Sequence, residues 1–141
     1  MVRQATAEDW PKVLELMRAC NEASCHEADF DDASVLHMFE LSLKNPSFAC
    51  FVTEKVDGFV YLALSASHFN FSVIYANELG FWGKGGKALV NKASKWAKDM
   101  GASRLSMASE DCIKGAAMER WYRKAGFVPT GRTHAKNLEL V

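Results

Sequence analysis

Residues 78–100 read ELGFWGKGGKALVNKASKWAKDM, and the rest of the chain is organised around them. The segment 79–82 is typical of the end of a strand, the segment 83–87 carries no bulky side chain except two lysines, and apolar residues then recur at helical spacing as far as Met100. The first turn of a helix has unpaired N–H groups, its dipole favours negative charge, and glycines let a phosphate come close to the backbone. We therefore expect a phosphate-bearing ligand at the start of a helix over 86–100. The alternative is a plain strand-to-helix turn in which the glycines only let the chain reverse.

The composition predicts a globular protein with one domain over residues 1–141. Hydrophobic residues make up 49% and charged residues 24%, which excludes a disordered chain. Lys plus Arg and Asp plus Glu are equal, at 17 each, so we expect no nucleic-acid partner held by bulk charge. No apolar run is long enough to span a bilayer and no signal-peptide pattern opens the chain, so we expect no membrane partner and a cytoplasmic location.

The four cysteines are Cys20, Cys25, Cys50 and Cys112, and no two of them form a C-x-x-C motif. This scatter predicts free thiols in a reducing compartment. Cys20 with the run Cys25-His26-Glu27 fits no common zinc spacing, so we predict no metal site.

The periodicity of the apolar residues predicts an α/β protein with one mixed sheet and helices on both faces. Thr6 and Asp9 have the spacing of a helix N-terminal cap, and Asn45-Pro46 ends the second helix. The expected order is β-α-α-β-β-β-α-β-α-β. The expected strands are 2–5, 48–54, 59–67, 72–81, 104–108 and about 135–140, and the expected helices are about 10–21, 32–44, 86–100 and 115–125.

Three segments together resemble the GNAT N-acetyltransferase family, most closely its short members carried by bacteriophages. They are VRQATAEDWPKVLELM at 2–17, GKGGKALVNKASKWAKDMGASRLSM at 83–107 and MERWYRKAGFVPTGRTHAKNL at 118–138. The most specific element is Trp121-Tyr122-x-x-x-Gly126-Phe127 after a βα unit. The resemblance covers nearly the whole chain and implies the acyl-CoA N-acyltransferase fold.

The resemblance also implies a reaction and its residues. Acetyl-CoA would be the cosubstrate, lying where the fourth and fifth strands part, and an amine on a small molecule, a peptide terminus or a lysine would be the acceptor. Tyr122 would protonate the leaving thiolate, and Glu78 would take the proton from the amine. The residues expected to contact acetyl-CoA are Leu79, Gly80, Phe81, Gly83, Lys84, Gly85, Gly86, Lys87 and Ala88. The acceptor pocket would be lined by residues 22–31, residues 67–72 and the last strand.

The loop departs from the family pattern Gln/Arg-x-x-Gly-x-Gly/Ala. With Gly86 aligned to the last glycine, Phe81 stands at the Gln/Arg position and Lys84 at the middle glycine; with Gly85 aligned instead, the loop is one residue short. Two alternatives therefore stay open: a protein that has lost turnover and docks on a host protein, and a sensor that binds acetyl-CoA without transfer. Tyr122 could instead only pack, and Glu78 could be solvated or paired with a lysine. Many relatives pair through edge strands, so a homodimer is also possible.

Overall fold

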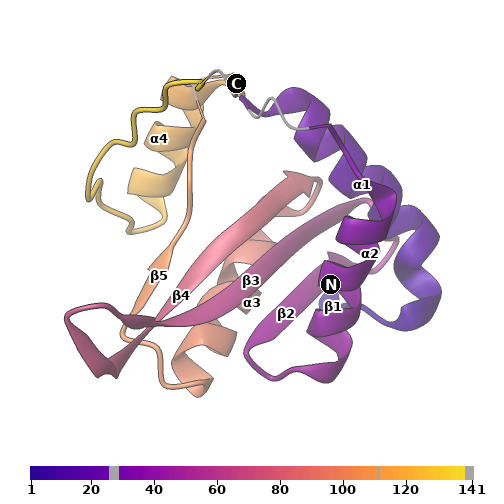
Figure 1. Cartoon of the computed structure of the whole chain (residues 1–141), viewed down its shortest axis with the longest axis horizontal. Coiled ribbons are helices and arrows are strands. Elements are labelled where there is room, and N and C mark those ends of the chain that lie inside the picture. Colours follow the sequence, from indigo (N-terminus) through magenta and orange to yellow (C-terminus); the bar gives the residue numbers. More distant parts are fainter. Residues whose placement is uncertain (26–28, 111, 139–141) are drawn as a thin grey trace.

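The computed structural model describes residues 1–25, 29–110 and 112–138, and its centre is a five-stranded sheet. The strands follow one another across the sheet in the order β1-β2-β3-β4-β5. The first three pairings are antiparallel, and the β4–β5 pairing is parallel (Figure 1). The strands are β1 (Val2–Gln4), β2 (Phe48–Thr53), β3 (Gly58–Ser67), β4 (Asn70–Gly83) and β5 (Arg104–Ser106).

Helices cover both faces of the sheet. Helices α1 and α2 pack together on one face, and α3 crosses the other, while α4 lies beyond the end of β5 (Figure 1). The helices are the short 3₁₀ turn η1 (Ala7–Asp9), α1 (Trp10–Ala23), α2 (Asp32–Lys44), α3 (Gly86–Asp99) and α4 (Gly115–Lys124). The predicted fold class, a mixed sheet between helices, is confirmed. Within the described ranges, no helix is both long and apolar enough to cross a bilayer.

Two apolar cores lie on opposite faces of the central strands because successive side chains of a strand point to opposite sides. On one face Val52 and Phe59 pack with Val13 and Phe39 of the two N-terminal helices. On the other face a second core joins residues of β2 and β3 to residues of α3. Its members are Ala49, Phe51, Val60 and Leu62 from the strands and Leu89 and Ala93 from α3. This double burial explains why β2 and the first half of β3 are nearly continuous apolar runs.

Strands β4 and β5 pair over a short distance and then separate. Their register is Tyr75↔Arg104, Ala76↔Leu105 and Asn77↔Ser106. Just beyond, the β3–β4 register shifts, so that Tyr61 pairs with Gly80 while Leu62 pairs with Glu78, and Leu79 is left as a bulge. A bulge bends its strand and increases the local twist. On the side of β4 that faces β5, the strand from Glu78 onward therefore has no neighbouring strand in the part of the chain that the structure describes.

The strand predicted at 135–140 is wrong for its described part. Residues 127–138 contain no strand, and the remainder lies outside the described residues. In this segment Ala135 and Leu138 stand three apart rather than two, so an extended chain would place them on opposite faces. Leu138 is 76% exposed, and without a buried face nothing stabilises a sixth strand there.

Candidate active site

The glycine loop between β4 and α3 is anchored by the turn that joins β2 to β3. The Lys84 N–H donates to the Asp57 carbonyl oxygen at 2.9 Å. A Cβ on Gly58 would lie 1.9 Å from the Lys84 carbonyl oxygen, so only glycine allows this approach. Gly85 caps α3 with φ +75°, in the left-handed region that glycine adopts readily.

The start of α3 leaves a short row of backbone donors. Leu89 N–H is the first to bond back, to the Gly85 carbonyl oxygen at 2.9 Å. Within the described ranges, the N–H groups at 85–88 have no acceptor in the protein. The Lys84 N–H is not one of these donors, because it already bonds to Asp57. The row of possible anion donors is therefore Gly85, Gly86, Lys87 and Ala88, with the exposed Lys84 and Lys87 side chains beside it.

Two tryptophans, Trp82 and Trp121, lie near this loop in different surroundings. Trp82 is partly buried against the core beneath α1 and α2. Trp121 of α4 stands near Gly86, where a Cβ would lie 3.8 Å from the Trp121 Cζ2 atom. Its ring centroid lies 6.3 Å from that of Phe81. Trp121 therefore lies beside both the start of α3 and Phe81 of β4.

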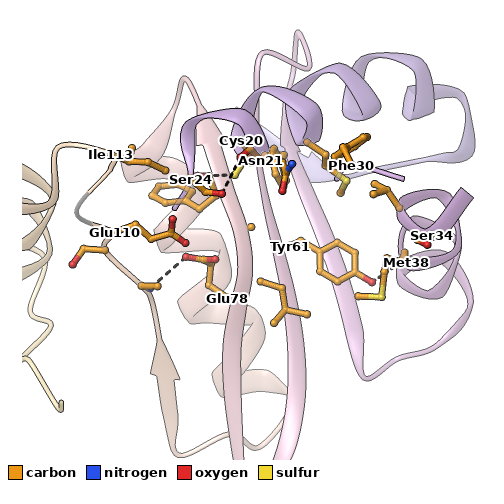
Figure 2. A pocket seen from close by; sticks show the side chains of 18 of the residues that line it. Cys20, Asn21, Ser24, Phe30, Ser34, Met38, Tyr61, Glu78, Glu110 and Ile113 are labelled. Carbon is orange, nitrogen blue, oxygen red and sulfur yellow. Dashed lines mark hydrogen bonds between the residues drawn. The ribbon is translucent and has the colours of Figure 1, made fainter. Parts of the chain in front are cut away.

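A cavity of about 420 Å³ opens on the α1/α2 side of the free β4 edge (Figure 2). Glu78, Leu79, Gly80 and Phe81 form its floor, and Tyr122 closes one side. The opposite walls come from α1, from α2 and from residues 29–31, 108–110 and 113 around them. Of the residues 22–31 expected around the acceptor, Ser24, Asp29, Phe30 and Asp31 line this cavity. Residues 67–72 do not line it, since they form the far tip of the β3–β4 hairpin, and the described part of the C-terminal segment does not line it either.

Glu78 and Tyr122 both bond to the backbone of one residue, Ala108. The Ala108 N–H donates to Glu78 Oε1 at 3.3 Å, and the Tyr122 hydroxyl donates to the Ala108 carbonyl oxygen at 2.9 Å. Ala108 follows β5, so these bonds span the point where β4 and β5 part. Within the described ranges Glu78 has no lysine partner, and Tyr122 is buried and hydrogen-bonded.

Burial dominates the electrostatics of both groups. The pKa of Glu78 is raised to about 7, mainly by burial and to a smaller extent by the charge of Glu110, while the Ala108 N–H acts in the opposite direction. Burial, together with the charge of Glu78, raises the pKa of the Tyr122 hydroxyl. A carboxylate with a pKa near 7 accepts a proton readily at neutral pH, and a phenol with a raised pKa stays protonated.

Glu110 is a lining residue that the sequence did not indicate. Its carboxylate lies above that of Glu78 (Figure 2), and its Oε2 accepts a hydrogen bond from the Cys25 N–H at 2.9 Å. Glu110 falls in a polar loop with no local motif, so only the approach of α1 to this loop reveals it.

The prediction of four free thiols is wrong for two of them. Cys25 and Cys112 form a disulfide with their Cα atoms 5.5 Å apart, whereas Cys20 and Cys50 are free. The partners are 87 positions apart, and that separation hides their proximity in the sequence. His26 and Glu27 lie outside the described residues. Elsewhere in the described chain, no three His, Cys, Asp or Glu side chains gather in a way that could hold a metal ion.

Comparison with protein families gives one match. The model of the family described as "Acetyltransferase (GNAT) family" matches residues 10–127. No curated protein matches the chain.

Solved structures with similar folds include several acetyltransferases. A putative acetyltransferase from Agrobacterium tumefaciens has a TM-score of 0.74 at 21% identity, with 98% of this chain and 99% of that chain covered. Glucosamine-6-phosphate N-acetyltransferase from Arabidopsis thaliana has a TM-score of 0.73 at 13% identity, covering 99% and 98%. An aminoglycoside N-acetyltransferase in complex with CoA has a TM-score of 0.76 at 15% identity, covering 99% and 95%. At these identities the structural likeness establishes the fold alone.

Proposed function

Because this chain belongs to the acetyltransferase (GNAT) family, we propose that it is an N-acetyltransferase that moves an acetyl group directly from acetyl-CoA to an amine. The observation that carries the proposal is the meeting of Glu78 and Tyr122 at Ala108, beside an open strand edge and a cavity. That arrangement supports the proposal, because it would put a proton acceptor and a proton donor near the two ends of one transfer.

The residues at the loop fit a diphosphate. The N–H groups at 85–88 have no acceptor in the described protein, they start a helix, and two lysines flank them. Acetyl-CoA, when bound, supplies the thioester whose carbonyl carbon the amine attacks. The unpaired backbone of β4 around the Leu79 bulge would hold the pantetheine arm and polarise the thioester carbonyl.

Glu78 would act as the general base. An amine is protonated at neutral pH and cannot attack until it loses a proton. Glu78 lines the cavity and has a pKa near 7, so it is partly ionised at neutral pH and can take that proton, directly or through water. No covalent enzyme intermediate is needed.

Tyr122 would act as the general acid. Its hydroxyl donates to the Ala108 carbonyl oxygen, and its proton is retained because the pKa is raised. Turning from that oxygen to the leaving sulfur would let the hydroxyl protonate the thiolate. Trp121, next to it on α4, would separate this reacting end from the phosphate end at Gly86.

The charge of the cavity favours a cationic acceptor. Its lining in the described chain includes Asp29, Asp31, Glu78 and Glu110 and no Lys, Arg or His. The neighbours named above act on aminoglycosides and on glucosamine-6-phosphate, both amino sugars. Of these two, we expect the polycationic aminoglycoside to be acetylated and the phosphorylated sugar to be rejected, because its phosphate would be repelled.

The test measures thiol release from acetyl-CoA with neamine, glucosamine-6-phosphate and a peptide with a free N-terminus, alongside calorimetry with CoA. We expect CoA binding and turnover with the cationic amine. Absence of CoA binding would refute the proposal. Binding without turnover on any amine would favour the sensor, the alternative supported by the loss of the Lys84 N–H from the donor row.

A further inference from the structure

The Cys25–Cys112 disulfide joins two walls of the cavity that lie far apart in the sequence. Cys25 follows the end of α1, next to Ser24, and Cys112 lies just before α4, next to Ile113. Ser24 and Ile113 both line the cavity. The covalent bond therefore fixes the spacing between the α1 wall and the wall that leads to α4.

The same junction positions Glu110. The Cys25 N–H donates to Glu110 Oε2 at 2.9 Å, and the Cys112 N–H approaches the Cys25 sulfur at 3.2 Å. Figure 2 shows the Glu110 carboxylate beside that of Glu78. A backbone amide on one wall thus holds a carboxylate from the other wall, and this contact depends on the two walls staying together.

Two nearby carboxylates repel each other unless a cation lies between them. The charge of Glu110 already contributes to the raised pKa of Glu78. An acceptor ammonium placed between the two carboxylates would relieve this repulsion. A dicationic acceptor would benefit most, because one of its amines must give up its proton to Glu78 and the other keeps its positive charge.

We propose that the Cys25–Cys112 disulfide is a redox-responsive clamp on the acceptor site, which holds Glu110 beside Glu78 and thereby strengthens binding of a dicationic amine. The inference rests on the proposed function, since it assigns the acceptor to this cavity. Reduction by a dithiol breaks the Cys25–Cys112 S–S bond. Two electrons and two protons pass to the two cysteines, and the dithiol becomes a cyclic disulfide. Cys25 and Cys112 are both exposed, so a dithiol can reach the bond.

The experiment uses the full chain purified in air, with and without dithiothreitol. Mass spectrometry after thiol alkylation should show two free cysteines before reduction and four after it, in line with the free Cys20 and Cys50. Calorimetry then measures binding of 1,4-diaminobutane and of n-butylamine, which has the same carbon chain and one charge. We expect reduction to weaken binding of the diamine about threefold, the scale of a partly exposed ion pair, and to change n-butylamine less.

Two variants make the inference specific. Glu110→Gln should weaken diamine binding by a similar factor and should abolish the response to dithiothreitol. The double variant Cys25→Ser/Cys112→Ser should match the reduced protein and be unaffected by dithiothreitol. Because a double variant could lose stability, its thermal unfolding and its CoA binding are measured in parallel, and reduction of the unmodified chain gives the same information without a substitution.

The outcomes are distinct. Four free cysteines before reduction would overturn the clamp, and so would diamine binding that is unchanged by dithiothreitol. An equal dithiothreitol effect in the double serine variant would also overturn it. Thiol release from acetyl-CoA is measured separately: its absence with every amine would refute the proposed function, while a redox-dependent affinity for the diamine would still support the clamp.

Discussion

Replacing Glu78 by glutamine should change how the stability of the protein depends on pH. Burial raises the pKa of Glu78 from its ordinary 4.5 to about 7. The folded protein therefore binds this proton more tightly than the unfolded chain does. The resulting stabilisation is complete below pH 4.5, declines between pH 4.5 and 7, and is lost above 7. At about 1.4 kcal/mol for each tenfold change in proton affinity, the loss is about 3 kcal/mol.

Glu78→Gln removes the titrating group while keeping a side chain of nearly the same shape. The unfolding free energy of the variant minus that of the wild type should therefore rise by about 2–3 kcal/mol between pH 4.5 and 8, the lower figure allowing for the partial exposure of the side chain. Urea denaturation at half-unit pH steps measures this difference. Glu15→Gln, an exposed position on α1, serves as the matched control and should give a curve parallel to that of the wild type.

Parallel curves for Glu78→Gln and the wild type would refute the argument, because they would mean that Glu78 titrates alike in the folded and unfolded chains. A difference that falls with rising pH would contradict its sign. The titration of Glu78 should also affect the kinetics. If Glu78 is the base, the acid limb of the pH profile of kcat/KM should report a pKa near 7.

Three further predictions concern the acid, the loop and the disulfide. Tyr122→Phe should lower kcat about 100-fold while leaving CoA binding by calorimetry unchanged, since general acid catalysis typically contributes that much; an unchanged rate would remove Tyr122 as the acid. Gly85→Ala should lower the unfolding free energy by about 1–2 kcal/mol and weaken CoA binding, because its φ is +75° and the added Cβ would lie 2.6 Å from Thr53 Cγ2; full stability in urea would contradict the loop geometry. Cys25→Ser/Cys112→Ser should lower the urea midpoint, since releasing a loop closed across 87 positions costs up to about 4.6 kcal/mol in the chain-entropy account; an unchanged midpoint would show that the link does not constrain the unfolded chain.

The local elements of the fold were predictable because each depends on neighbouring residues. The helix expected at 32–44 is α2, Asp32–Lys44, capped by the Asp31 side chain on the Ser34 N–H. Thr6 and Asp9 form the expected cap ahead of α1, with the Thr6 N–H donating to Asp9 at 2.8 Å. Apolar spacing, caps and turn glycines act over a few residues, so they are visible in the sequence.

The candidate site was only partly predictable. The family resemblance nominated Glu78, Tyr122 and the glycine loop, and their roles remain proposals. Ala108, whose N–H and carbonyl oxygen bond to these two side chains, had no signal in the sequence. Neither did the engagement of the Lys84 N–H by Asp57, which depends on the turn between β2 and β3 approaching the loop.

The sequence by itself determined the alternation of helices and strands, the glycine loop at the start of α3 and the resemblance to acetyltransferases. Only the tertiary structure decided that Leu79 bulges out of β4, that Cys25 and Cys112 are bonded, that Glu110 lies beside Glu78, and that the described chain after Phe127 adds no strand. Periodicity reports which face of a segment is buried. It does not report which distant segment buries it, and each of these four features depends on that second fact.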